Sequence, residues 1–310
     1  MGLMDGPFVL SNLHKFRYML GRQKKTTLKR LPEYSIRKYV DMNQQEIVKS
    51  GSSETTRGAF KFSFNFTNFK KAAINYNNNY DDKFLEWFLG FFEALGRLSF
   101  FGNILCIKYN DDTVLEFIKN NLGFGKVVSG SFIILDHDIP MFFSLIQNNL
   151  LLEKSELLLQ KFIQNNNVSG KRSIPFNMSL IKLLRETSWL SGFFSLEGCF
   201  NAQMYRSNHS YVFRARVVLD QKGESFLLNH IKIAIPGGLL RARSDKKNHR
   251  LVFMSNLSLT NLIKYFIENP LLSEKKLKTY NRWLYYLIES RKGDLDSNDL
   301  LVLGRTINKN

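Results

Sequence analysis

The sequence predicts an α+β protein made of two pseudo-symmetric repeats, each with the element order αββαββα. The first observation is a ten-residue stretch that occurs twice: residues 87–96 read WFLGFFEALG, and residues 189–198 read WLSGFFSLEG. Five positions are identical, and the second copy starts about 100 residues after the first, which is the size of a small domain. The second observation is that β-prone and helical patterns follow both copies in the same order. An internal repeat of this kind decides the architecture.

Both copies are predicted to be helices that end at their last glycine. Gly96 and Gly198 suit the left-handed position that closes many helices. A glycine inside a helix costs about 1 kcal/mol relative to alanine, so Gly90 and Gly192 require a compensating gain. Close passage of two backbones supplies such a gain. Two ordinary core helices with aromatic faces are the alternative, and the matching glycines disfavour it.

The first repeat is predicted over residues 59–165. After its signature helix we expect a hairpin over 98–109 that turns at 102–103, and then a helix over 113–121. A strand pair over 126–135 and a helix over 138–152, with Pro140 in its first turn, complete the repeat. Residues 165–172 have the composition of an exposed linker.

The second repeat is predicted over residues 166–310 and follows the same order. Its elements are strands over 200–205 and 212–219, a helix over 225–234, strands over 239–243 and 250–254, and a closing helix over 257–267. A further basic helix is expected over 272–287.

The repeated stretches resemble the two signature helices of the LAGLIDADG homing endonucleases and maturases, in their single-chain form with two pseudo-repeats. Neighbouring text is also similar: NNNYDDKFLEWF at 77–88, GCFN at 198–201 and LLSEKKLKTYNRW at 271–283. The resemblance covers about residues 60–290. It implies a saddle of antiparallel sheets around two central packed helices, whose core is built by Gly90, Gly96, Gly192 and Gly198.

The resemblance also implies where catalysis would take place. In that family an acid just before the last glycine of each signature helix holds a divalent metal, and cutting both strands of a duplex needs such an acid at each scissile phosphate. Glu197 occupies this position in the second copy, but Leu95 occupies it in the first. Glu93 is expected to point to a different face of the helix. Glu197 is therefore the one remaining catalytic and metal-binding candidate, and it is expected to be insufficient alone.

A second family feature is also uneven between the repeats. The family often carries a Gln-Lys pair that positions water and contacts the nucleic-acid backbone. The second repeat has Gln221–Lys222, whereas Tyr109–Asn110 stand at the equivalent place in the first. A one-residue error in this alignment is the alternative explanation. Taken with Leu95, the difference argues against cleavage of both strands.

The charge balance indicates a polyanionic partner. Lys+Arg number 44 against Asp+Glu 27, which gives a net charge of +17 and a pI near 9.8. Nucleic acid is favoured over a membrane surface, and no apolar run reaches the roughly 18 residues of a membrane span. Residues 1–58 are predicted to be a basic, partly extended arm. A solvated tail is the alternative to its role as a phosphate clamp, for which the candidates are Arg22, Lys24, Lys25, Lys29 and Arg30.

The saddle formed by the two sheets is the expected nucleic-acid face. Alternate residues of a strand share one face, so arginines spaced by two can line a groove. A merely solvated face is the alternative. On the second sheet the candidates are Gln203, Tyr205, Arg206, Arg214, Arg216, Gln221, Lys222, Arg241, Arg243, Lys246, Lys247 and Arg250.

The first sheet is expected to read duplex bases poorly. Base readout requires hydrogen-bonding side chains. Apolar residues are expected at the readout positions of this sheet: Phe100, Leu105, Ile107, Phe132 and Ile134.

These observations predict a non-cleaving LAGLIDADG-derived protein that binds structured RNA. It would act as a group I intron maturase or as a structural component of the mitochondrial ribosome, with splicing or ribosomal proteins as further partners. Plentiful Phe, Asn, Lys, Ile and Tyr indicate an AT-rich genome, and the N-terminus shows no clear presequence, so we expect mitochondrial origin and location. No cofactor is required in this interpretation.

Two alternatives remain open. One is a Mg²⁺-dependent DNA homing endonuclease that cuts weakly or nicks one strand through Glu197. The other is a DNA-binding protein without a role in RNA binding.

Overall fold

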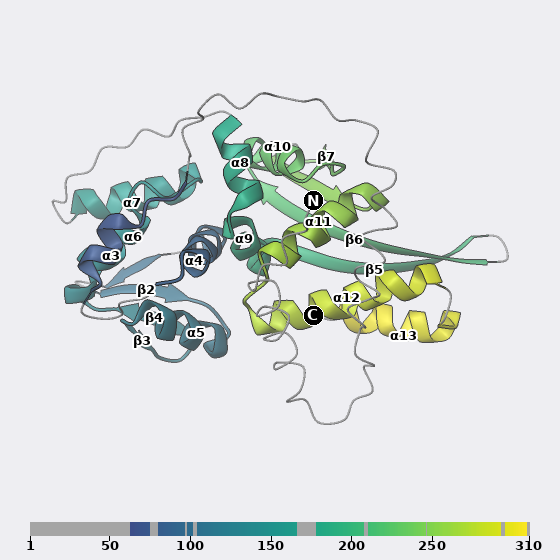
Figure 1. The fold of residues 1–310 in the computed structure, drawn as a ribbon, viewed down its shortest axis with the longest axis horizontal. Coiled ribbons are helices and arrows are strands. Elements are labelled where there is room, and N and C mark those ends of the chain that lie inside the picture. Colours follow the sequence, from purple (N-terminus) through teal and green to yellow (C-terminus); the bar gives the residue numbers. More distant parts are fainter. Residues whose placement is uncertain are drawn as a thin grey trace, which may run out of the picture.

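Two four-stranded antiparallel sheets flank a central pair of helices, α4 (Asp82–Leu95) and α9 (Trp189–Glu197), as Figure 1 shows. The structure is a computed structural model that describes residues 63–74, 80–96, 98–101, 104–165, 178–207, 210–245, 247–292 and 295–308. The predicted α+β fold is confirmed. The predicted N-terminal arm lies outside the described residues. None of the described helices combines the length and apolar character that crossing a bilayer requires.

The two central helices touch backbone to backbone at their glycines. A Cβ atom on Gly90 would lie 1.8 Å from the main-chain oxygen of Trp189, and one on Gly192 would lie 1.9 Å from that of Trp87. No side chain fits at such distances. The close passage inferred from the two mid-helix glycines is therefore present, and each glycine allows the other helix to approach.

Polar contacts also join the pair. Trp87 Nε1 donates to Ser195 Oγ at 3.2 Å, and the backbone N–H of Ser188 donates to the Glu86 carboxylate at 2.9 Å. The first bond runs from α4 to α9 and the second from the residue before α9 to α4, so together they fix the position of one helix along the other.

The two closing glycines differ. Gly96 has φ +59° and ends α4 in the left-handed conformation, as expected. Gly198 has φ −70° and ψ 124°, so the expectation of a left-handed end for α9 is wrong. The reason is that α9 runs directly into a strand, of which Gly198 is the first residue. Its lack of a side chain still matters, because a Cβ atom there would lie 2.5 Å from the Phe194 ring.

The two sheets share one topology but differ in size. The first contains β1 (Ser99–Phe101), β2 (Ile104–Lys108), β3 (Lys126–Val127) and β4 (Ser131–Ile134), in the order β1-β2-β4-β3. The second contains β5 (Gly198–Ser207), β6 (Ser210–Lys222), β7 (Leu239–Ala242) and β8 (Asn248–Phe253), in the order β5-β6-β8-β7. Strands β5 and β6 have 10 and 13 residues, against 3 and 5 for β1 and β2. The long β5–β6 hairpin extends well beyond the rest of its sheet (Figure 1).

Most helices lie where the sequence placed them. These are α5 (Asp112–Leu122), α10 (Ser225–Ala234), α11 (Asn256–Glu268) and α12 (Glu274–Lys292). The helix predicted over 138–152 is shorter: α6 (Ile139–Ile146) ends where Gln147 becomes extended and Asn148 takes φ +64°. Four helices were not predicted, and these are α3 (Thr67–Ala72), α7 (Glu153–Asn165), α8 (Met178–Glu186) and α13 (Ser297–Asn308).

The apolar residues of the first sheet face the core, which corrects the expectation that they occupy readout positions. Leu105, Ile107, Phe132 and Ile134 are each at most 2% exposed. The backbone of Phe100 pairs with that of Leu105 in the strand ladder. The error has a simple cause, since assigning a strand to the wrong face by one residue exchanges its two sides. The opposite side carries Ser99, Ile104, Cys106, Lys108, Lys126, Ser131 and Ile133.

The helix contact predicts a large effect of one methyl group. Gly90→Ala should lower the free energy of unfolding by roughly 3 kcal/mol, because the helices must separate to admit it. Gly304→Ala is the matched control, since a Cβ atom there meets Tyr286 at 3.4 Å and alanine favours the helix. Chemical denaturation measures both. Equal stability of the two variants would contradict the contact.

The buried Glu86 predicts a pH dependence of stability. Burial raises the pKa of Glu86 to about 7, although the hydrogen bond from Ser188 opposes the rise. The folded state therefore holds this proton more tightly, and the free energy of unfolding falls as the pH rises from the unfolded pKa to about 7. Glu86→Gln keeps the acceptor and removes the titration. Its loss of stability between about pH 5 and pH 8 should be smaller than that of the wild type by on the order of 2 kcal/mol; identical curves would contradict the account.

Candidate nucleic-acid interface

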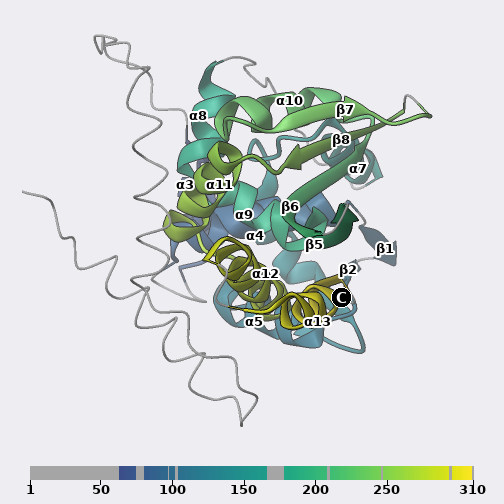
Figure 2. The same ribbon diagram turned by 90° about the vertical axis from the view of Figure 1, so that its right-hand side faces the viewer.

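The side of the second sheet opposite its core helices, here called the open face, carries a group of basic side chains. Figure 2 shows the sheet with α8, α11 and α12 on its other side. Strand register places alternate residues of β5, β6, β7 and β8 on the open face, while Phe200, Val217, Leu251 and their neighbours fill the core. Of the predicted binding residues, those on the open face are Gln203, Tyr205, Arg214, Arg216, Lys222, Arg241 and Arg250.

Two predicted residues lie on the other side, and these predictions are corrected. Arg206 pairs with Tyr211 and shares the face of Ala202 and Ala215, away from Tyr205. Gln221 is 6% exposed and points to the core side. Both corrections follow from strand alternation, which a list of neighbouring polar residues ignores.

The remaining predicted residues lie at the margins. Arg243 directly follows β7, and Lys247 is exposed in the turn before β8. Lys246 lies outside the described residues, as do the arm residues Arg22, Lys24, Lys25, Lys29 and Arg30.

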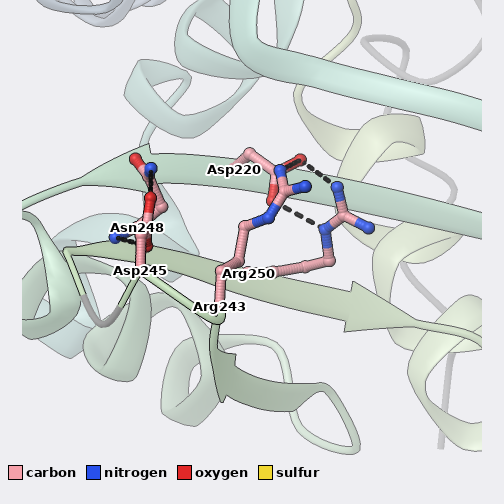
Figure 3. A network of polar contacts seen from close by, with 5 residues as sticks. All are labelled: Asp220, Arg243, Asp245, Asn248 and Arg250. Atoms are coloured by element: carbon pink, nitrogen blue, oxygen red, sulfur yellow. Dashed lines mark hydrogen bonds and ion pairs between the residues drawn. The ribbon is translucent and has the colours of Figure 1, made fainter.

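An acidic residue that the sequence analysis did not single out organises part of the open face. Asp220 accepts from Arg250 Nε at 2.7 Å and from Arg250 Nη2 at 2.6 Å, and Arg243 Nη1 lies 3.8 Å away (Figure 3). Asp245 accepts from the N–H groups of Lys247 and Asn248 and so shapes the turn before β8 (Figure 3). The bidentate pair fixes Arg250 and neutralises much of its charge.

Other arginines keep their charge available. In the part of the chain that the structure describes, Arg214, Arg216 and Arg241 form no ion pair with an acidic side chain. Arg216 donates from Nε to Asn201 at 2.9 Å, and the Arg214 guanidinium lies 4.8 Å from the Tyr205 ring centroid. A stripe of positioned cations of this kind is suited to backbone phosphates.

The ends of the central helices form the second part of the site. Glu197 is the last residue of α9 and is half-buried. Burial raises the pKa of Glu197, while the charge of Lys154, a hydrogen bond from Gln221 and the charge of Lys276 lower it. At the end of α4, the partly buried Leu95 packs against the core.

Glu93 does not replace the missing acid. It is fully buried and accepts hydrogen bonds from the backbone N–H groups of Leu151 and Leu152, the second at 3.1 Å. Leu151 and Leu152 precede α7, so the buried carboxylate connects α4 to the start of α7.

Two lysines occupy the helix ends. Lys276 donates from Nζ to Gly198 O at 2.7 Å. Burial lowers the pKa of Lys276, and the negative charge of Glu197 opposes this. The Nζ of Lys154 lies 3.8 Å from the point where a Cβ atom on Gly96 would sit. Cations are favoured at helix C-termini, because the helix dipole is negative there.

The Gln-Lys pair and its predicted counterpart have different surroundings. Gln221 lies opposite His249 in the ladder of the second sheet. The N–H of Tyr109, which follows β2, donates to Gly130 O at 2.9 Å, and the Tyr109 ring centroid lies 5.2 Å from that of Phe91. The equivalence of Tyr109 and Gln221 stays a prediction from the sequence.

These residues do not fit a pair of shared divalent cations. Mg²⁺ and Ca²⁺ require several oxygen ligands, mostly carboxylates. Across the described residues there is no group of three His, Cys, Asp or Glu side chains that could hold a metal. Only one helix end provides a carboxylate, and Asp220 is paired with Arg250. Lysine ammonium groups stand beside both ends, where a cation would otherwise be attracted.

The sequence analysis did not single out Lys154 or Lys276 as site residues. Lys276 lies within the C-terminal text that resembles the family, and Lys154 lies in the first turn of a helix that was predicted as a connection. Only the packing of α7 and α12 brings them to the central helices.

Comparison with known proteins gives the following matches. Residues 190–287 match the family described as LAGLIDADG endonuclease. A curated relative, "Probable intron-encoded endonuclease 4" of Neurospora crassa, is 28% identical over 237 residues. The match covers 71% of this chain and 43% of that relative, so the chain spans less than half of the relative's length.

Solved structures show the same fold. The I-SmaMI LAGLIDADG homing endonuclease bound to cleaved DNA has a TM-score of 0.57 at 17% identity, covering 73% of this chain and 97% of that one. The LAGLIDADG meganuclease I-AabMI bound to uncleaved DNA has a TM-score of 0.53 at 20% identity, covering 72% and 98%. At these identities the likeness concerns the fold alone.

The single carboxylate at the helix ends, Glu197, predicts how the protein responds to divalent cations. Ca²⁺ up to about 5 mM, above the roughly millimolar Kd of weak sites, should leave the melting temperature unchanged. Differential scanning calorimetry of the wild type and Glu197→Gln, with and without the cation, measures this. A dose-dependent rise in the wild type that Glu197→Gln removes would show that Glu197 holds a metal.

Proposed function

We propose that this chain, whose residues 190–287 match the LAGLIDADG endonuclease family and whose described residues have the fold of a LAGLIDADG homing endonuclease, binds structured RNA without cutting nucleic acid. The observation that carries the proposal is that α4 ends at Leu95 while α9 ends at Glu197. Lys154 and Lys276 lie beside these helix ends.

The absence of cutting is argued from charge. Phosphodiester hydrolysis on two strands needs a hard-cation site at each scissile phosphate. Leu95 has no oxygen ligand to offer, and the predicted alignment places Tyr109 where the other repeat has the amide that accompanies Glu197. On this alignment, the first half of the site lacks both polar groups of the second half.

The choice of RNA is argued from the asymmetry of the two sheets. A duplex target read by two half-sites needs two comparable surfaces. Here the first sheet has strands of 3 and 5 residues in its hairpin, and its outward side carries Lys108 and Lys126 as its charged groups. The open face of the second sheet carries several arginines on strands of 10 and 13 residues. One concentrated cationic surface suits a compact folded RNA, which proteins recognise by shape and phosphate contacts.

The biological setting follows from the same proposal. The relative named "Probable intron-encoded endonuclease 4" links this family to introns, and we infer a role on intron RNA, as a group I intron maturase in mitochondria. A structural role in the mitochondrial ribosome uses the same surface. In the first case the protein partners are splicing factors, and in the second they are ribosomal proteins.

A second candidate function is a DNA endonuclease that nicks one strand. The observation that favours it is the retained Glu197–Gln221 pair at the end of α9. One carboxylate with an amide at one scissile phosphate is the minimum for attack on a single strand with Mg²⁺.

One experiment separates these functions. Purified protein is incubated with Mg²⁺ and a supercoiled plasmid library of candidate DNA targets, while RNA bound in the host cell is recovered by crosslinking. The proposal expects intact plasmid and enriched intron or ribosomal RNA. Nicked circles without enriched RNA would establish the second candidate, and linear plasmid would overturn both. Enrichment of ribosomal rather than intron RNA decides between the two settings.

The open face predicts which arginines bind RNA. Arg214→Ala and Arg216→Ala should each weaken RNA binding and lower the slope of log Kd against log salt by about 1, because each loses one phosphate contact. Arg206→Ala is the matched control, because it removes the same charge from the opposite face of the hairpin. Fluorescence anisotropy over a salt series measures the slopes. Equal effects of all three variants would mean that net charge alone drives binding.

The position of Glu197 predicts that its carboxylate contributes little to RNA affinity. Glu197→Gln should change the RNA affinity by no more than about twofold, since its side chain contacts Gln221 on the core side rather than the open face. The same anisotropy measurement tests this. A loss of tenfold or so would assign a binding role to the carboxylate.

A further inference from the structure

A cavity of about 350 Å³ lies between the outer edge of β5 and the C-terminal helix α13. Its walls include Gln203, Met204, Tyr205, Tyr286, Leu301 and Arg305. Its volume is at the lower end of the roughly 300–1,000 Å³ of small-ligand pockets. We propose that this cavity receives one unstacked nucleobase of the bound RNA, an inference that rests on the RNA-binding function proposed above.

The side-chain amide of Asn308 already binds the main chain at the edge of β5. The N–H of Ala202 donates to Asn308 Oδ1 at 3.1 Å, and Asn308 Nδ2 donates to Ala202 O. The main-chain groups of Ala202 therefore point away from β6. Those of Met204, two residues further on, point to the same side, because main-chain directions alternate along a strand. Met204 lines the cavity, so its N–H and C=O are directed towards the cavity side of the strand edge.

A nucleobase can bind the main-chain N–H and C=O of Met204 together. The Watson–Crick edge of uracil or adenine offers a donor beside an acceptor, in the same sense as the carboxamide of Asn308. Bases in loops and bulges of RNA expose this edge, whereas paired bases hide it. The edge at Met204 therefore selects for an unpaired base.

Tyr205 supplies a stacking surface. Its side chain is 38% exposed, and it lies on the open face as well as on the cavity wall. The Arg214 guanidinium lies 4.8 Å from the ring centroid on one side. A base stacked on an aromatic ring is worth roughly 1–3 kcal/mol by alanine substitution, whichever base it is. The cation at Arg214 also lies where the phosphate next to a displaced base would pass.

The position of the cavity agrees with the proposal. The cavity lies next to Arg214 and Arg216 on the open face. An RNA backbone bound by these two arginines therefore needs to displace only one nucleotide to fill the cavity. Displacing a base costs a few kcal/mol, and least when the base is unpaired. Gln203 and Arg305, from opposite walls, offer further hydrogen bonds to a base edge.

The test compares two RNA hairpins of the same length, one fully paired and one with a single bulged adenosine, by fluorescence anisotropy with the full chain. The wild type should prefer the bulged hairpin by about tenfold. Leu301→Trp, which fills the cavity from α13, should remove this preference, and Tyr205→Ala should do the same. Tyr211→Ala should keep it, because Tyr211 is similarly exposed, at 48%, on the other face of the same hairpin.

The outcomes are distinguishable. If neither hairpin binds, the proposed function fails. If both bind with equal affinity in the wild type, or if Leu301→Trp keeps the preference, the function stands and the nucleobase site is overturned. Competition by free adenosine monophosphate that lowers only the preference supports a base site. Concentration-dependent self-association in sedimentation that Leu301→Trp abolishes assigns the cavity to a second copy of the chain and overturns the proposal.

Discussion

The contact between α4 and α9 is the constraint on which the rest of the structure depends. A Cβ atom on Gly90 or Gly192 would collide with a main-chain oxygen of the other helix. The two glycines therefore fix both the distance between the helices and the position of one helix along the other. Each sheet packs against its own central helix, so this register also sets how the two sheets face each other. It brings the last residues of both helices together, which is what any shared chemistry at that place requires. The packing at two glycines therefore positions both the open face and the end of α9 that carries Glu197.

The protein retains this scaffold while its two halves have diverged in charge. At the end of α9 Glu197 and its amide partner Gln221 are present, whereas α4 ends at Leu95. The ammonium groups of Lys154 and Lys276 stabilise the helix ends, whose dipoles are negative. The second hairpin is long and cationic, and the first is short. The acid at the helix end and the longer cationic hairpin therefore both belong to the second half.

Much of the fold could be predicted from sequence because its signals are local. The repeat, the two mid-helix glycines and the hairpins follow from spacing within one segment. The errors concern which side of a strand a residue faces: Arg206, Gln221 and the apolar residues of the first sheet were assigned without a register, and a shift of one position exchanges the faces. The roles of Lys154, Asp220 and α13 depend on long-range packing, which no pattern within one segment contains. The site was therefore predictable in composition but not in orientation.

The most direct test of this one-sided account is to map RNA–protein crosslinks on the purified chain in the presence of a metal chelator. Mass spectrometry of crosslinked peptides identifies the strands that touch RNA. The account predicts crosslinks on β5, β6, β7 and β8, undiminished by the chelator, with few on β1 to β4. Crosslinks spread equally over both sheets, or lost when divalent cations are removed, would contradict it.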